Sequence, residues 1–201
     1  MEIKASNVMD LRKKTGAGIM DCKNALNETG GDIDKAIDFL RKKGLAEASK
    51  KTGRISKEGI IGSYIHAGSR IGVLVEVNCE TDFVAKTPDF VEFAKDIAMH
   101  IAAANPLYLK REAVPKEVLE KEKEIYKSQA LDSGKPEKVI EKIVQGKAEK
   151  YFSQVCLLEQ AYVKEPDVSI KELIDLIIAK VGENISLRRF IRYQLSESLD
   201  E

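Results

Sequence analysis

Tryptophan is absent from this chain of 201 residues, and cysteine and histidine are scarce, with three and two copies. Cys22, Cys79 and Cys156 are odd in number and far apart, which excludes a regular disulfide framework and the paired spacing of a zinc knuckle. We expect each to be a small buried apolar residue. His66 and His100 lie on different predicted elements, so a zinc site or a catalytic triad would need scattered parts.

The chain has no excess of one charge, because Lys+Arg and Asp+Glu each number 33. It therefore has no general attraction to a phosphate backbone, and direct binding of nucleic acid is not expected. The sequence also has no apolar run of the length that a signal peptide or a membrane helix needs. We expect a cytoplasmic protein without membrane contact.

Motifs that carry catalysis are missing as well. The segment Gly68-Ser-Arg-Ile-Gly72 falls inside a predicted β-hairpin, without the strand-to-helix context of a dinucleotide loop. Gly146-Lys147 has no preceding glycine at Walker spacing. The sequence therefore predicts a protein that is not an enzyme and has no metal site and no cofactor.

Helical apolar spacing is clear in residues 1–45, where three short segments predict a three-helix docking domain. Asp32 is expected to cap the third helix and Gly44 to end it. Residues 46–58 are polar and rich in Lys and Arg, so we interpret them as a solvated linker. A contact of this basic segment with RNA is the alternative.

Residues 59–201 predict an α+β core. Ile71, Val73, Val75 and Val77 alternate with other residues, as in a strand with one buried face, which belongs to a β-hairpin. A helix is expected to begin at Thr87-Pro88, with Thr87 as its cap. Its apolar residues share one predicted stripe, made by Phe90, Phe93, Ala94, Ile97 and Ile101. Residues 115–156 predict a protruding antiparallel helical hairpin with a turn at 132–136. A capped helix and a final strand complete the core.

Two segments resemble the signatures of a known family. Leu11-Arg-Lys-Lys-Thr-Gly-Ala-Gly-Ile-Met-Asp-Cys-Lys-Asn-Ala-Leu26 and Ile71-Gly-Val-Leu-Val-Glu-Val-Asn-Cys-Glu-Thr-Asp-Phe-Val-Ala-Lys86 are similar to the two signature segments of the elongation factor Ts family. The resemblance implies a ubiquitin-associated-like helical domain followed by an α+β core with a small antiparallel sheet. Longer members have two copies of the core subdomain, whereas this chain has one, so a homodimer that forms a 2:2 complex is expected.

The resemblance also implies a function. Members are guanine-nucleotide exchange factors that bind elongation factor Tu and promote release of GDP. By the resemblance, Phe83 is expected at the end of the hairpin strand, where it inserts into the GTPase domain of elongation factor Tu and disturbs its Mg²⁺ site, with Thr81, Asp82 and Val84 in support. The alternative for Phe83 is an ordinary core aromatic at a corner between a strand and a helix.

Docking residues are implied in the same way. Arg12, Ile19 and Met20 are expected to contact the GTPase domain of elongation factor Tu, and His66 another part of it. The alternative for Ile19 and Met20 is a place in the core of the helical domain. A ribosome- or RNA-associated binding module is the rival function, although the balanced charge argues against it.

Overall fold

The fold is α+β, as the sequence predicts, in a computed structural model that describes residues 3–131 and 136–197. The chain divides into two compact units, each assembled from separate stretches. The first unit comprises Met1–Ile60, Asn78–Phe93 and Glu172–Ser186, and the second comprises Ile61–Val77, Ala94–Lys171 and Leu187–Glu201. The boundaries at residues 45 and 58 that we infer from the sequence stay predictions.

Three helices form the amino-terminal part of the first unit: α1 (Ala5–Thr15), α2 (Ile19–Glu28) and α3 (Ile33–Lys51). Asp32 caps α3 as predicted, since its carboxylate accepts a hydrogen bond from the backbone N–H of Lys35 at 3.1 Å. A small apolar core holds the three helices together. Its buried members are Val8, Leu11, Cys22, Ala25, Leu26 and Ala36.

Helix α3 is longer than the sequence predicts. The predicted end at Gly44 is wrong, because α3 continues to Lys51 and takes in residues 46–51 of the expected linker. Gly44 is buried, and a Cβ atom there would lie 3.2 Å from the Cβ of Ala179. The glycine therefore allows close approach of another helix and does not end its own.

A three-stranded sheet has the order β1 (Glu58–Ile65), β2 (Ile71–Cys79) and β5 (Ser186–Gln194). β1 and β2 form the predicted hairpin, closed by a hydrogen bond from His66 N–H to the Ile71 carbonyl. The alternation along β2 is confirmed, because its inward-facing valines are buried and Leu74 on the opposite face is exposed. These buried valines are Val73, Val75 and Val77.

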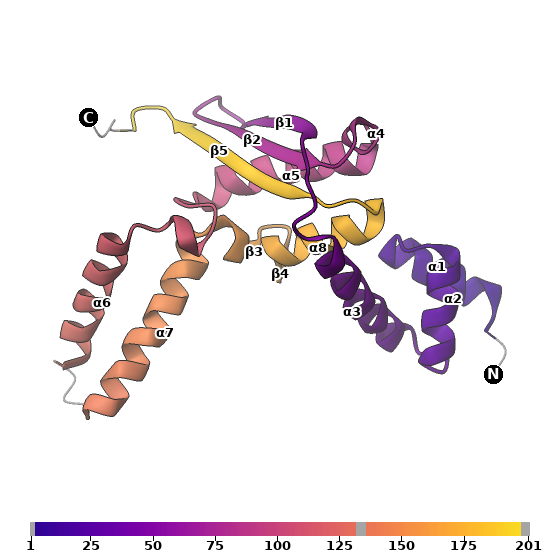
Figure 1. Ribbon diagram of the computed structural model, residues 1–201, viewed down its shortest axis with the longest axis horizontal. Helices are drawn as coiled ribbons and strands as arrows, with labels where there is room; N and C mark the ends of the chain where they lie inside the picture. The colour runs from indigo at the N-terminus through magenta and orange to yellow at the C-terminus, as the bar shows by residue number, and fades with distance from the viewer. Residues whose placement is uncertain (1–2, 132–135, 198–201) are drawn as a thin grey trace. The chain divides into compact units, whose positions relative to one another are not determined.

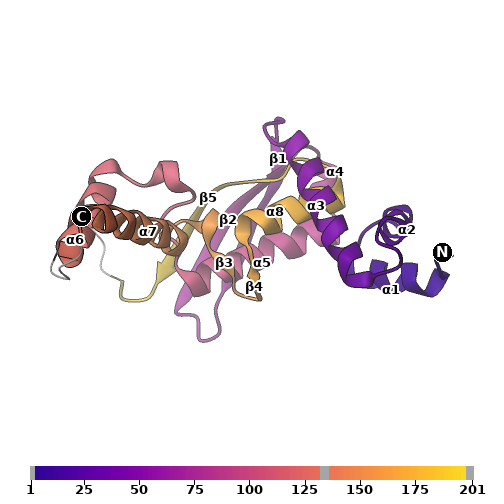
Figure 2. The ribbon, with the colours of Figure 1, turned by 90° about the horizontal axis from the view of Figure 1, so that it is seen from below.

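Helix α5 (Pro88–Ala104) lies along one face of the sheet (Figures 1 and 2). Its predicted cap is confirmed, since the Thr87 hydroxyl accepts a hydrogen bond from Phe90 N–H. The predicted apolar stripe is buried as well, at Phe90, Phe93, Ala94, Ile97 and Ile101. Where α5 passes under β1, a Cβ atom on Gly62 would lie 3.1 Å from the Ala94 carbonyl oxygen, so the glycine permits this close packing.

Helices α6 (Lys116–Leu131) and α7 (Glu137–Val155) lie side by side as the predicted helical hairpin (Figures 1 and 2). The turn predicted at residues 132–136 lies, apart from residue 136, outside the described residues. Lys147 joins the two helices, because its ammonium group lies 5.3 Å from the centroid of the Tyr126 ring and 2.6 Å from Gln129 Oε1. The hairpin thus depends on polar as well as apolar contacts.

Two short strands were not predicted from the sequence, β3 (Ala161–Tyr162) and β4 (Glu165–Ser169), which pair antiparallel. Short 3-10 helices, η1 (Arg111–Ala113) and η2 (Leu157–Glu159), border the helical hairpin.

His100 on α5 is fully buried, with its Nε2 3.0 Å from Gln160 Oε1. Helix α8 (Ile170–Val181) leads into β5. In the described part of the chain, no helix is long and apolar enough to cross a membrane.

Candidate functional site

Phe83 lies on α4 (Asp82–Ala85), a single helical turn that follows β2 directly, and 81% of its surface is exposed. The alternative in which Phe83 is a core aromatic is therefore wrong. The sequence places Phe83 at a strand end, but the structure places it on this turn. Thr81 caps the turn, with its hydroxyl oxygen 3.5 Å from Val84 N. A large exposed aromatic on a hydrogen-bonded turn is suited to insertion into an apolar cleft.

Asp82 is exposed beside Phe83 and bonds within its own helix. Its carboxylate accepts a hydrogen bond from Lys86 Nζ at 2.6 Å, one helical turn away. This hydrogen bond and the charge of Lys86 lower the pKa of Asp82. Asp82 is therefore ionised at neutral pH, and its negative charge lies in the first turn of α4, where the helix dipole favours it.

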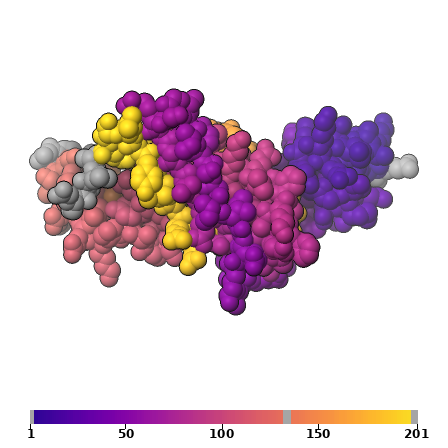
Figure 3. All heavy atoms as spheres, turned by 90° about the horizontal axis from the view of Figure 1, so that it is seen from above, coloured from indigo at the N-terminus to yellow at the C-terminus, as the bar shows by residue number. Residues whose placement is uncertain are grey.

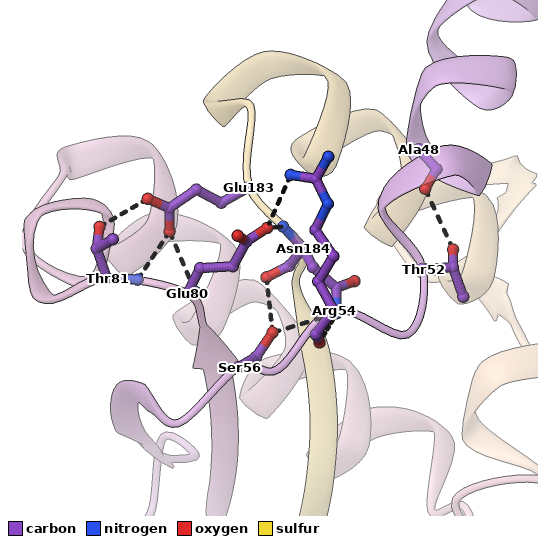
Figure 4. Close-up of polar contacts among 8 residues, drawn as sticks. All are labelled: Ala48, Thr52, Arg54, Ser56, Glu80, Thr81, Glu183 and Asn184. Atoms are coloured by element: carbon purple, nitrogen blue, oxygen red, sulfur yellow. Dashed lines mark hydrogen bonds and ion pairs between the residues drawn. The ribbon is translucent and has the colours of Figure 1, made fainter.

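The sequence did not predict the contact that holds the turn in place, which is made by Glu183 (Figure 4). Glu183 Oε2 accepts hydrogen bonds from the backbone N–H groups of Glu80 and Thr81, at 3.1 and 3.0 Å. Glu183 Oε1 accepts a third from the Thr81 hydroxyl, at 2.6 Å. One carboxylate thus accepts three hydrogen bonds at the amino-terminal end of α4.

A second set of hydrogen bonds joins the same two segments, and here a carboxylate of the first segment, that of Glu80, is the acceptor (Figure 4). Glu80 Oε1 accepts a hydrogen bond from Asn184 N–H at 2.6 Å and lies 3.6 Å from Arg54 Nη1. The Asn184 side-chain amide donates to the Arg54 carbonyl at 2.8 Å and to the Ser56 hydroxyl at 3.2 Å. The segment between α3 and β1 is therefore bonded to Glu80, which precedes the turn of Phe83, and to Asn184, which follows Glu183.

Cys79, at the end of β2, is buried and reduced, as are Cys22 and Cys156, which confirms the expectation for all three. Its thiol lies 3.1 Å from the Thr81 carbonyl oxygen. Burial, together with the nearby Glu183 carboxylate, raises the pKa of Cys79 to about 11. The thiol therefore contributes to packing between β2 and the turn of Phe83 and does not act as a nucleophile.

The predicted docking residues lie on the surface of the three-helix part. Arg12 is exposed near the end of α1, and Ile19 and Met20 begin α2 with 49% and 65% of their surfaces exposed. The alternative in which Ile19 and Met20 belong to the core of this part is therefore wrong. Their exposed apolar side chains lie next to Gly18, the residue that precedes α2.

His66 lies in the other unit, at the turn between β1 and β2, and is exposed. Its Nδ1 is 3.2 Å from the Tyr64 hydroxyl. Most of the predicted site residues thus have exposed side chains available to a partner, whereas Thr81 and Val84 are half-buried. The structure brings Thr81, Asp82, Phe83 and Val84 together on one turn, as their adjacency in sequence requires.

Groups of metal-ligating side chains are not found among the described residues: none holds three or more His, Cys, Asp or Glu residues in a suitable arrangement. The turn that carries Phe83 offers a binding surface for a partner, made of an exposed aromatic ring, a carboxylate and apolar side chains. Glu183 could have been noted only through Gly182-Glu-Asn-Ile-Ser-Leu-Arg-Arg-Phe190, a segment that is also similar to the elongation factor Ts family. No spacing rule links it to Thr81.

Comparison with known proteins gives a consistent result. The family model described as "Elongation factor TS" matches residues 47–176. The chain is 61% identical over 199 residues to elongation factor Ts of Geobacter metallireducens, covering 99% of this chain and 92% of that protein. It is 63% identical over 199 residues to elongation factor Ts of Syntrophomonas wolfei, covering 99% and 93%. The chain therefore belongs to the elongation factor Ts family.

Proposed function

We propose that this protein is a guanine-nucleotide exchange factor for elongation factor Tu in translation elongation, and that it promotes release of GDP. The observation that carries the proposal is the exposure of Phe83, at 81%, on a turn fixed by hydrogen bonds in a chain of this family. In this function the protein makes and breaks no covalent bond, and its site of action is the cytoplasm, where translation takes place.

The physical requirement is a difference in affinity. A GTPase holds GDP through backbone amides, a lysine and a Mg²⁺ ion that bridges phosphate and protein oxygens. An exchange factor has to bind the nucleotide-free GTPase more tightly than the GDP-bound form, because coupling between two ligands is reciprocal. Equal affinity for the two forms would release no GDP.

Phe83 supplies this difference in our proposal by entering an apolar gap in the GTPase domain that closes when Mg²⁺ and GDP are bound. Val84 adds apolar surface beside it. The Asp82 carboxylate provides a polar contact near the insertion, and Thr81 caps the turn that carries all three. Anchors of this kind, large aromatic side chains that fill a pocket, dominate the energetics of many interfaces.

Docking is a separate contribution. Ile19 and Met20 form an exposed apolar pair at the start of α2, and Arg12 adds a positive charge on α1. We propose that this surface binds the GTPase domain of elongation factor Tu in both nucleotide states and thereby raises the local concentration of the Phe83 turn. His66 contacts another part of elongation factor Tu.

The test is release of fluorescently labelled GDP from purified elongation factor Tu, measured with and without this protein. We expect a release rate that rises with its concentration and then saturates. An unchanged rate would contradict the proposal. A ribosome- or RNA-associated module, the rival function, would leave this rate unchanged and bind RNA with strong dependence on salt.

We also propose that two copies pair through the outer face of the sheet, as the single core copy of this chain suggests. Five large apolar side chains of this face are exposed on neighbouring strands: Ile61, Ile65, Leu74, Ile191 and Tyr193. Figure 3 shows residues of these strands, in purple and yellow, on an open face of the molecule. A twofold pairing would cover the same patch on both chains and give a 2:2 complex with elongation factor Tu.

A substitution in the central strand tests the pairing. Leu74→Lys is expected to produce monomers, because it places two like charges in the middle of the covered face. Val163→Lys, at an exposed apolar residue between β3 and β4, is the matched control and is expected to remain dimeric. Sedimentation velocity measures the masses. A monomeric parent protein, or a dimeric Leu74→Lys variant, would contradict the pairing.

A further inference from the structure

The turn that carries Phe83 is too short to maintain its own position. Helix α4 has four residues, and a helix of one turn is unstable in isolation because nucleation costs more than its few hydrogen bonds return. An exposed Phe83 makes little packing contact that could orient the turn. The direction in which Phe83 points therefore depends on how the backbone of Glu80 and Thr81 is held.

Glu183 holds this backbone from a segment that is distant in sequence. Its carboxylate accepts the N–H groups of Glu80 and Thr81 and the hydroxyl of Thr81, all within 3.1 Å. Hydrogen bonds to a charged acceptor are stronger than those between neutral groups. Thr81 in turn caps α4, so Glu183 also fixes the group that begins the helix.

The position of Glu183 is itself determined by the end of α8. Gly182 follows this helix with a φ of +83° and donates a hydrogen bond to the Ile178 carbonyl at 2.9 Å. This left-handed conformation is the usual ending for a helix and turns the chain toward the corner. The bond from Asn184 N–H to Glu80 Oε1 then joins the two segments a second time, in the opposite direction.

We propose that Glu183 is a positioning residue for nucleotide exchange, which acts by fixing the turn that presents Phe83. It does not contact elongation factor Tu itself in this role. The inference rests on the proposed function, in which Phe83 inserts into the GTPase domain. It goes further by assigning the efficiency of insertion to a carboxylate located 100 residues along the chain from Phe83.

Glu183→Ala and Glu183→Gln test the assignment. Glu183→Ala removes all three acceptor bonds, and we expect the maximal rate of GDP release from elongation factor Tu to fall about tenfold. Glu183→Gln keeps the shape and one carbonyl oxygen, so its rate should lie between those of Glu183→Ala and the parent. Glu165→Gln, at an exposed glutamate on β4, removes one charge elsewhere and should leave the rate unchanged.

Two readouts separate positioning from a general loss of structure. The concentration of factor that gives half-maximal stimulation should change less than the maximal rate, because the docking surface on α1 and α2 is retained. Hydrogen exchange of the Glu80 and Thr81 amides should accelerate at least tenfold in Glu183→Ala, while the amides of α2 keep their protection. If Glu183→Ala does not fold, both readouts are taken from Glu183→Gln.

A double variant distinguishes failure of this inference from failure of the proposed function. With Phe83→Ala in place, adding Glu183→Ala should reduce the rate by less than twofold, because nothing remains for Glu183 to position. If Phe83→Ala alone leaves release unchanged, the proposed function is wrong. If Phe83→Ala slows release and Glu183→Ala does not, or if the two effects multiply, only the role of Glu183 is wrong.

Discussion

The removal of the Phe83 ring is the sharpest test of the proposed exchange mechanism. Phe83 has 81% of its surface exposed, so Phe83→Ala removes few internal contacts, and we expect the free energy of unfolding to change by less than about 0.5 kcal/mol. The effect should be confined to the complex. Thermal unfolding of the variant, compared with the parent, checks this half of the prediction.

The loss in the complex can be calculated from the surface that the ring would bury. A phenylalanine buries roughly 150 Å² or more, of which the alanine retains a part, so about 100 Å² of apolar contact is lost. At about 25 cal/mol per Å² this corresponds to about 2.5 kcal/mol. If the whole difference favours the nucleotide-free complex, stimulated GDP release falls by up to about 60-fold.

Stopped-flow fluorescence of labelled GDP measures this rate at saturating factor. Ile55→Ala, which truncates another highly exposed apolar side chain of the same unit, is the control and should behave as the parent. A native Phe83→Ala variant that releases GDP at the parent rate would remove Phe83 from the mechanism. A variant that binds weakly but reaches the parent rate at saturation would make Phe83 a docking residue instead.

Three further predictions concern other parts of the molecule. Ile19→Asp combined with Met20→Asp, at two exposed side chains, should raise the concentration needed for half-maximal stimulation more than it lowers the maximal rate; unchanged binding by titration would refute the docking role. Gly44→Leu should destabilise the fold by about 1–3 kcal/mol in urea denaturation because of the close Ala179 side chain, whereas Gly146→Leu, with open space around it, should not. Burial lowers the pKa of His100 from 6.5, so the unfolded chain takes up this proton first as pH falls. Between pH 7.5 and 5.5 the parent should therefore lose more stability than His100→Gln, and equal losses would contradict this linkage.

Local signals in the sequence were sufficient for much of the fold. The alternation of β2, the caps at Asp32 and Thr87, and the apolar stripe of α5 each depend on residues within a few positions of one another. Their chemistry is the same wherever the rest of the chain lies. The exposed Phe83 could be predicted only through the family resemblance, because an aromatic at such a corner is compatible with burial as well.

Long-range contacts explain what the sequence did not reveal. Gly44 has the local appearance of a helix end, but its role depends on a neighbouring helix that approaches within 3.2 Å of its missing Cβ. Glu183 is an ordinary acidic residue until the fold brings Thr81 to it. The strand pair β3 and β4 is too short to give a periodic pattern. In each case tertiary structure decides the role of the residue.

The buried thiol of Cys79 has a consequence for the chemical durability of the corner. With a pKa of about 11, only about one thiol in ten thousand is ionised at pH 7, whereas a few per cent of ordinary cysteine side chains are. Peroxides and disulfides react with the ionised form of a thiol. This sulfur is therefore protected from them in two ways, because it is buried and because it is almost entirely protonated. We therefore expect Cys79 to react with peroxide much more slowly than an exposed cysteine of low pKa, so that the turn of Phe83 keeps its covalent structure.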